Sequence, residues 1–297
     1  MRPIRRGFWL SLVVLGSGLA LAVPAANAQA LGYGNELQPG VGNLTGGDVT
    51  PDGASPPMTQ QAKDKVASTL AWAAAMKAGN TAAAAKATNA YDAKWGGPGA
   101  GSSKPQSRTA LTAAPTSRTL GVAQVGQNTG YYCGPAAGYE IIRYLHGAGF
   151  TSRYDGSAAG QAGLANGNHM ATDANRVTAW STGRYVTGVN RWRGNNYYVQ
   201  VNAPSGSLLT NIFANYIGNN GMPFSGDTVE FAGGAHYNGH PSNQTIGHWI
   251  TAYGYTGSGA TGYWADSSTT VWSAPNPTFS YNTSSFSSFL QSNGVAY

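Results

Sequence analysis

Apolar side chains recur at helical spacing in several segments of this chain. Across 58–95 they are mostly Ala, with Lys and Thr between them, and a Gly-Asn-Thr sequence at 79–81 interrupts the run. This pattern predicts two helices that form a hairpin. Residues 134–146 and 207–217 predict amphipathic helices, and 172–180 is a weaker helical candidate.

Later in the chain the apolar runs become short and are divided by Gly and Asn turns, which is typical of β-strands. The strongest predicted strand is His248–Tyr255. The others are Thr228–Phe231, Gly262–Ser267 and Thr270–Ser273. Helices first and an antiparallel sheet later is the order of an α+β fold.

Segments without periodicity divide the chain. Residues 1–28 combine a basic start, an apolar stretch and an Ala-Asn-Ala site, which predicts a signal peptide cleaved before Gln29; an uncleaved membrane anchor is the alternative. Residues 29–57 and 96–120 are rich in Gly, Pro, Ser and Thr, so we interpret them as a flexible leader and a linker. The compact domain is expected to span 121–297.

The helical segment 58–95 has a thin apolar face and is not expected to fold alone. One interpretation is an appendage that is docked on the main domain. The other is a pro-segment that covers a catalytic cleft until it is removed. The sequence does not decide between them.

The net charge of +6 lies entirely outside the predicted domain. Three arginines belong to the predicted signal peptide, and residues 29–120 carry a net charge of +3. Residues 121–297 contain six arginines, no lysine and six acids, so they are neutral. A nucleic-acid-binding surface needs clustered cations, and we therefore expect no nucleic-acid partner. No stretch after the signal is apolar enough to cross a bilayer, so we expect a secreted protein without stable membrane insertion.

Cys133 is the only cysteine of a chain that is expected to be exported, although exported proteins normally pair their cysteines. Gly134-Pro135 follows it, and proline is favoured in the first turn of a helix. The thiol is therefore expected at the N-terminus of the 134–146 helix, where the helix dipole and a nearby imidazolium lower the pKa of a thiol. We interpret Cys133 as a candidate nucleophile; an inert buried thiol is the alternative.

Among the five histidines, His248 is the best candidate for a base beside this thiol, because it begins the strongest predicted strand. The next predicted strand carries Asp266. A hairpin that pairs about residue 259 would set Asp266 opposite Ala252, about one diagonal step from His248. A carboxylate there could accept a hydrogen bond from the imidazole and fix its tautomer.

Gln127 lies six residues before Cys133, in a loop. A side-chain amide at this position could direct its N–H at the oxyanion that forms when the thiol attacks a carbonyl. Gln124, three residues earlier, is a competing candidate.

Taken together, these residues resemble the C39-like branch of the papain-like cysteine peptidases. The resemblance rests on Gln127, on Cys133-Gly134-Pro135-Ala136-Ala137 before an amphipathic helix, on Gly247-His248-Trp249-Ile250, and on Asp266. It covers roughly residues 121–270. Residues 150–206, rich in Gly and Asn, and the helical segment before residue 96 depart from the family pattern and leave the specificity open.

The resemblance implies a papain-like α+β fold in which the cysteine helix packs on an antiparallel sheet. It also implies that Cys133 is the nucleophile, His248 the general base and acid, Asp266 the residue that orients His248, and Gln127 the oxyanion donor. The chain would then be a secreted cysteine peptidase that hydrolyses a peptide or protein substrate.

Two other functions stay open. The first is a cell-wall peptide amidase, a transpeptidase or a secreted effector on the same fold, and the second is a non-catalytic binding protein. His236 and His240 have i, i+4 spacing, but Gly and Asn between them argue against the helix that a zinc site of this spacing needs. We therefore expect no metal ion and no cofactor.

Overall fold

The computed structural model describes residues 55–98 and 115–297. The predicted signal peptide (1–28), and most of the leader (29–57) and the linker (96–120), lie outside the described residues. Within the two described ranges, no helix combines the length and the apolar content needed to span a bilayer.

The predicted helical hairpin is confirmed. It consists of α2 (Gln60–Lys77) and α3 (Thr81–Trp95). The hydroxyl of Thr59 caps α2 by accepting the N–H of Ala62, and the Asn80 side chain caps α3. Gly79, between the two helices, has φ +68°, a conformation that glycine adopts at little cost.

An antiparallel sheet of seven strands forms the centre of the main domain, with the strand order β2-β7-β3-β4-β5-β6 and with β1 paired to β4. Every pairing within the described residues is antiparallel. The strands are β1 (Arg118–Thr119), β2 (Gln200–Asn202), β3 (Phe224–Glu230), β4 (Ile246–Thr256), β5 (Thr261–Ala265), β6 (Thr278–Asn282) and β7 (Gly294–Ala296).

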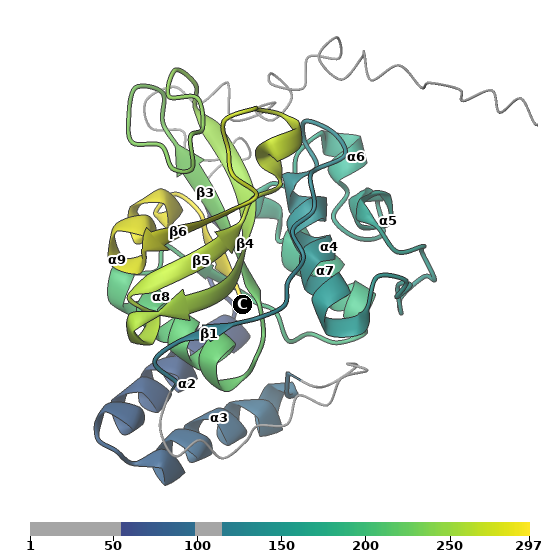
Figure 1. Cartoon of the computed structure of the whole chain (residues 1–297). Helices are drawn as coiled ribbons and strands as arrows, with labels where there is room; N and C mark the ends of the chain where they lie inside the picture. The colour runs from purple at the N-terminus through teal and green to yellow at the C-terminus, as the bar shows by residue number, and fades with distance from the viewer. Residues whose placement is uncertain (1–54, 99–114) are drawn as a thin grey trace, which may run out of the picture. The chain divides into compact units, whose positions relative to one another are not determined.

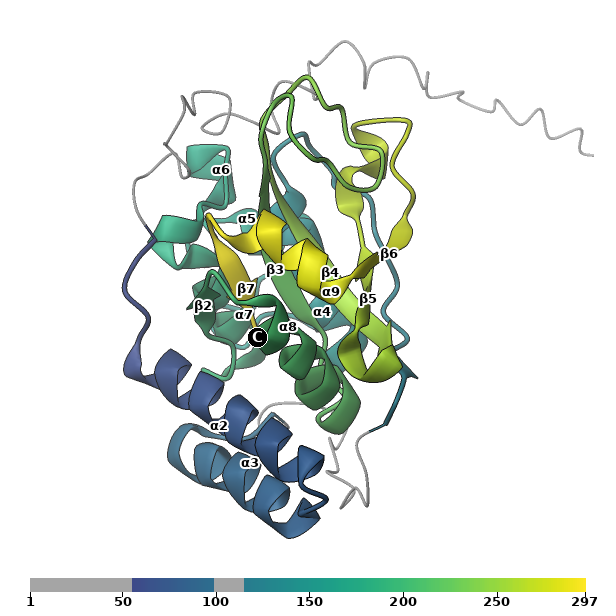
Figure 2. The ribbon, with the colours of Figure 1, turned by 90° about the vertical axis from the view of Figure 1, so that its left-hand side faces the viewer.

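Helices cover both faces of this sheet (Figure 1). One face carries α4 (Cys133–His146), α5 (Gln161–Ala165), α6 (Thr172–Asn175), the 3-10 turn η2 (Trp180–Thr182) and α7 (Arg184–Arg193). Figure 2 shows the other face, which carries α8 (Gly206–Ile212), the π-helical turn η3 (Phe213–Asn219), α9 (Thr283–Phe286) and the 3-10 turn η6 (Ser287–Leu290). The predicted α+β fold class is therefore confirmed.

Buried aromatic side chains hold these layers together. On the α7 face, the ring of Tyr185 stacks on Trp249 with 3.8 Å between the ring centroids. On the α8 face, Trp264 packs edge-on against Phe213 at 5.3 Å and against Phe224 at 5.7 Å. The apolar surface that these rings bury is the main source of the sheet's stability.

The hairpin docks on the main domain through a buried cation. Lys65 on α2 is 3% exposed, and its Nζ donates to the carbonyl oxygens of Tyr197 and Tyr297, each at 2.6 Å. The same ammonium lies 3.8 Å from the centroid of the Tyr197 ring and 4.7 Å from that of Tyr216. Removing the ammonium from water costs free energy. The hydrogen bonds and cation–π contacts replace the lost water contacts and offset this cost, so they stabilise the docking of the hairpin.

The hairpin lies near the C-terminal end of α4. The carbonyl oxygen of Pro98, which follows α3, accepts from Arg193, and Arg193 also contacts the ring of His146. His146 ends α4 and Cys133 begins it. A helix of 14 residues is about 20 Å long, so the hairpin docks far from Cys133. The docking agrees with the appendage interpretation, whereas the pro-segment interpretation stays a prediction.

Several predicted elements are wrong in extent or kind. Thr270–Ser273 is not a strand, because the chain forms the 3-10 turn η5 (Ser267–Thr270) after β5 and returns to the sheet at β6. Only the first part of 172–180 is helical, as α6. The strand predicted at Thr228–Phe231 begins earlier, as β3, and the whole of α7 was not predicted.

Candidate active site

Cys133 is the first residue of α4, so the thiol lies at the helix N-terminus, as predicted. The side chain is 7% exposed. Gly134 has no room for a larger side chain, because a Cβ there would lie 2.4 Å from Oγ1 of Thr178. The segment before the helix is fixed by Tyr132, whose hydroxyl donates to Asp173 at 2.5 Å. The local sequence therefore holds the thiol at the positive end of the helix dipole.

His248 and Asp266 meet, as the sequence predicted. His248 is fully buried on β4, and its Nε2 hydrogen bonds Oδ1 of Asp266 at 2.9 Å. The predicted strand register is wrong by two residues, because Ala252 pairs with Trp264 and not with Asp266. A bulge at Tyr253 shifts the pairing, and Asp266 consequently lies closer to His248 than the predicted register implied.

The environment of His248 favours its protonated form. Burial lowers the pKa of the imidazole, but the charge and hydrogen bond of Asp266, followed by the Cys133 thiol, outweigh burial and raise the pKa to about 10. For Asp266, burial raises the pKa, but the imidazoles of His248 and His240 hold it well below its usual range.

The geometry of the imidazole assigns its two nitrogens. Nε2 of His248 is bound to Asp266, and Nδ1 is buried without a hydrogen-bond partner among the described residues. Since the Cys133 thiol is close enough to raise the pKa of this ring, Nδ1 is the nitrogen left to face the sulfur. The imidazole is therefore hydrogen-bonded to the carboxylate, and the thiol lies near enough to raise the pKa of the ring.

Gln127 is buried and fastened to the turn that carries Asp266. Its backbone N–H donates to the carbonyl oxygen of Ser267, its Oε1 accepts from the Ser267 hydroxyl, and its carbonyl oxygen accepts from Thr270. Its Nε2 donates to the carbonyl oxygen of Thr129 at 2.8 Å, which uses one of the two amide hydrogens. The role of Gln127 as an oxyanion donor stays a prediction. Gln124, the competitor, donates to the carbonyl oxygen of Asp266.

Three of the four buried acids and one histidine of this region were not predicted. Residues 121–297 contain only six acids, and four of these are buried: Glu140, Asp227, Glu230 and Asp266. Burial raises the pKa of Glu140 to about 8, although hydrogen bonds from Thr251 and from the Val125 N–H lower it. Burial, together with the nearby Cys133, raises the pKa of Asp227. The signal that could have found two of them is an acid inside an apolar strand, since Asp227 and Glu230 both lie on β3.

His240 is the unpredicted histidine. Its Nε2 lies 3.0 Å from Oδ2 of Asp266, and its Nδ1 lies 2.6 Å from Glu230. His236 does not join them, because its ring nitrogens contact the carbonyl oxygens of Gly234 and Gln244. The i, i+4 pair is therefore not a common site.

His240, His248 and Asp266 offer one ligand atom each, all within 4.8 Å of one another, which is close enough to hold a metal ion. Each oxygen of Asp266 also lies at hydrogen-bond distance from one of the two imidazoles. These distances fit a buried hydrogen-bonded network as well as they fit a metal site.

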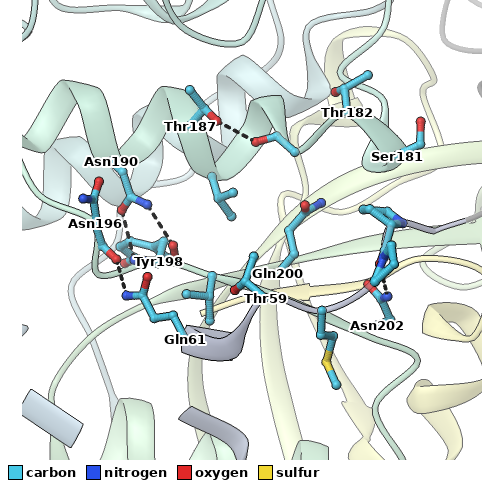
Figure 3. A pocket seen from close by; sticks show the side chains of 16 residues that line it. Thr59, Gln61, Ser181, Thr182, Thr187, Asn190, Asn196, Tyr198, Gln200 and Asn202 are labelled. Atoms are coloured by element: carbon cyan, nitrogen blue, oxygen red, sulfur yellow. Dashed lines mark hydrogen bonds between the residues drawn. The ribbon is translucent and has the colours of Figure 1, made fainter. Parts of the chain in front are cut away.

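A cavity of about 380 Å³ lies elsewhere, between the start of α2, α7 and β2 (Figure 3). Its amide side chains mostly bind the chain's own backbone: Asn190 bonds both the N–H and the carbonyl oxygen of Tyr198, and Gln61 donates to the carbonyl oxygen of Asn196. None of the four predicted site residues lines it. The cavity therefore lies between the start of the hairpin and the domain, away from the site at Cys133.

No match to this chain was found among protein-family models, curated proteins or solved structures. A thiol at a helix N-terminus beside a carboxylate-bound imidazole is suited to nucleophilic attack on an electrophilic carbon.

Proposed function

We propose that this chain is a cysteine peptidase with a papain-like fold, in which Cys133, His248 and Asp266 form a catalytic triad. The observation that carries the proposal is the position of His248, which hydrogen bonds Asp266 at 2.9 Å and lies beside the thiol that begins α4. Acyl transfer by a thiol requires a nucleophile, a base and a group that orients the base. All three are buried together.

The reaction would begin from the thiolate of Cys133 and the imidazolium of His248. The sulfur attacks the carbonyl carbon of the scissile amide, so that a C–S bond forms and an electron pair moves onto the carbonyl oxygen. His248 then gives its proton to the amide nitrogen, the C–N bond breaks, and the amine leaves a thioester on Cys133. His248 next takes a proton from water, whose oxygen attacks the thioester and releases the carboxylic acid and the thiolate.

The oxyanion would be held by two donors. The backbone N–H of Cys133 is at the first position of α4, where a helix has no intrahelical acceptor for it. The second hydrogen of the Gln127 amide is the other donor, because the bond to Thr129 uses only the first. The Ser267 contacts of Gln127 would keep the amide rigid during the reaction.

The substrate class that we propose is a peptide or protein outside the cytoplasm. Export rests on the sequence of residues 1–28, and the neutral charge of residues 121–297 gives no preference for a polyanion. Cell-wall peptides are one kind of substrate that the same chemistry would cut.

The test combines thiol reactivity with hydrolysis. Wild-type protein treated with iodoacetamide or an epoxide probe at pH 7 should gain one adduct on Cys133, and His248→Ala should label at least about 100-fold more slowly because the thiolate loses its partner. After denaturation in urea both proteins should label at the same rate, which controls for probe quality. Cys133→Ala should lose at least about 10³-fold in hydrolysis of a protein or peptide substrate.

A Cys133→Ala variant that keeps full hydrolysis would overturn the proposed mechanism. A native thiol that labels slowly and independently of His248 would point to the non-catalytic alternative. Parallel digestion of peptidoglycan and of unfolded protein separates a cell-wall amidase from a protein-cleaving enzyme.

A further inference from the structure

The side of Asp266 that faces away from His248 carries a second imidazole. Nε2 of His240 lies 3.0 Å from Oδ2 of Asp266, and Nδ1 of His240 lies 2.6 Å from Oε2 of Glu230. His240 is 4% exposed and Glu230 is 1% exposed. The triad uses only Oδ1 of Asp266, so these two residues have no part in the mechanism proposed above.

Asp266 is surrounded by donors. Oδ1 accepts from the N–H of Ser268 and lies 2.9 Å from Nε2 of His248, and Oδ2 accepts from the Asn238 amide and lies 3.0 Å from Nε2 of His240, which is also 3.1 Å from the Ser268 hydroxyl. A carboxylic acid needs one oxygen to donate, whereas a carboxylate accepts at every lone pair. Asp266 is therefore ionised, in agreement with its lowered pKa.

Glu230 accepts in the same way, since its Oε1 takes the N–H of Tyr237 while its Oε2 faces His240. A neutral imidazole has one N–H, so it can donate to only one of two carboxylates. His240 can donate to both Glu230 and Asp266 only as an imidazolium. Burial lowers its pKa, but the hydrogen bonds to Asp266 and Glu230, with their charges, outweigh burial and raise it.

The groups around this pair complete an alternating row of charge. Glu230, His240 and Asp266 are followed by His248 and then by Cys133. Two further acids lie near His248, namely Glu140 on α4 and Asp227 on β3. Burial raises the pKa of both, which favours their neutral forms.

We propose that His240 and Glu230 are positioning residues for the triad. Glu230 keeps His240 doubly protonated, and His240 holds Oδ2 of Asp266 so that Oδ1 stays on His248. The ring of His240 is 5.4 Å from the ring of His248, so its positive charge also limits how far Asp266 raises the pKa of His248. The effects on kcat rest on the proposed peptidase function, whereas the titration of the two histidines does not depend on it.

The first variant, Glu230→Gln, separates charge from hydrogen bonding. The new amide can still accept the Tyr237 N–H, and its NH₂ can donate to Nδ1 of His240, which then stays neutral and keeps its Nε2–H for Asp266. By NMR of labelled histidines, His240 should lose its imidazolium form between pH 6 and 9. The pKa of His248, read from the alkaline limb of Cys133 alkylation, should rise, because the cation that is lost lies next to His248, whereas the carboxylate that is lost with it lies on the far side of His240.

The second variant, Glu230→Gln with His240→Gln, removes the imidazole without leaving a buried unpaired charge. It should lower kcat about 10- to 100-fold with little change in KM, which is the usual effect of losing the partner that orients a functional side chain. Glu230→Gln alone should lower kcat less than about 3-fold, since its hydrogen bond to Asp266 survives. His236→Gln is the matched control from the same loop. It should change neither the pKa of His240, nor the pKa of His248, nor kcat, because the ring of His236 contacts the backbone oxygens of Gly234 and Gln244.

Three results would overturn the proposal. One is a His240 in the wild type that titrates near the ordinary value of about 6.5. Another is that neither variant changes the pKa of His248 or kcat, which would leave His240 and Glu230 with a structural role only. The last is stoichiometric binding of Zn²⁺ in calorimetry that the double variant abolishes, because His240, His248 and Asp266 would then form a metal site. If the histidines titrate as expected but no peptide is cut, the peptidase function fails while the positioning of His248 by this row stands.

Discussion

Glu140, a buried carboxyl group on α4, should make the stability of this protein depend on pH. Burial raises its pKa from the ordinary 4.5 to about 8, and the hydrogen bonds from Thr251 and the Val125 N–H offset only part of this. In the unfolded chain the group titrates near 4.5. The folded state thus holds the proton more tightly, and the stability that Glu140 contributes is lost as pH rises from about 4.5 to 8.

The size of the effect follows from the two pKa values. A difference between 4.5 and about 8 corresponds to about 5 kcal/mol between the protonated and the ionised limits. Glu140→Gln cannot ionise and keeps an oxygen for the Val125 N–H. We therefore expect the variant to match the wild type within about 1 kcal/mol at pH 5 and to exceed it by several kcal/mol at pH 9.

Urea unfolding at pH 5 and pH 9, followed by tryptophan fluorescence, measures this difference. With a slope of roughly 3 kcal/mol per M, the midpoint of the variant should lie about 1 to 2 M above that of the wild type at pH 9. A Cys133→Ala background in both proteins prevents self-cleavage. Asp64→Asn is the control, because the pKa of Asp64 is lowered to about 2 by hydrogen bonds led by Lys94, so its effect should be equal at the two pH values. An equal effect of Glu140→Gln at both pH values would refute the reasoning.

Three further predictions concern the site and the hairpin. Asp266→Asn leaves burial as the main influence on His248, so the pKa of His248 should fall from about 10 to below 6.5. The alkaline limb of the pH profile of Cys133 alkylation should then move down by at least about 3 pH units. An unmoved limb would exclude the pairing of His248 with Asp266. Gln127→Ala should lower kcat about 10²- to 10³-fold at nearly constant KM in steady-state hydrolysis, and an unchanged kcat would remove Gln127 from the oxyanion site. Lys65→Met removes the ammonium donor from the Tyr197 oxygen and one of two donors from the Tyr297 oxygen, and it should cost about 2 to 4 kcal/mol in urea unfolding. Lys63→Met, on the exposed side of α2, should cost less than about 0.5 kcal/mol, and equal losses would contradict the anchoring role.

The parts of the site that could be predicted are those in which local sequence and local structure agree. The Gly134-Pro135 pair forms the start of α4 and the apolar run after it forms the helix, so the position of Cys133 followed from neighbouring residues alone. The strand of His248 is long and mostly buried, which gives it a strong pattern. The meeting of His248 with Asp266 could be predicted because a short hairpin joins their strands.

The rest depended on tertiary structure. Asp266 ends β5 because its own side chain accepts the N–H of Ser268 and caps a 3-10 turn, so the β-branched residues that follow never form a strand. His240 lies in a loop and Glu230 on a strand, and nothing in their spacing shows that both reach Asp266. Only the pairing of β3 with β4, and the return of the loop between them, brings these groups together.

The docking of the hairpin decides what a pro-segment at 58–95 could do. Lys65 is buried among tyrosine rings and backbone oxygens of the main domain, so separating the hairpin would remove the ammonium donor from both oxygens and would expose an aromatic surface. The end of the hairpin, at Pro98, is joined through Arg193 to His146. His146 is separated from Cys133 by the length of α4, which is about 20 Å. A segment that inhibits by covering must reach the N-terminal end of α4. The helices α2 and α3 dock near the opposite end, whereas residues 55 and 56 run back to contact Ser292 and Asn202, so we expect loss of the two helices to lower the stability of the domain.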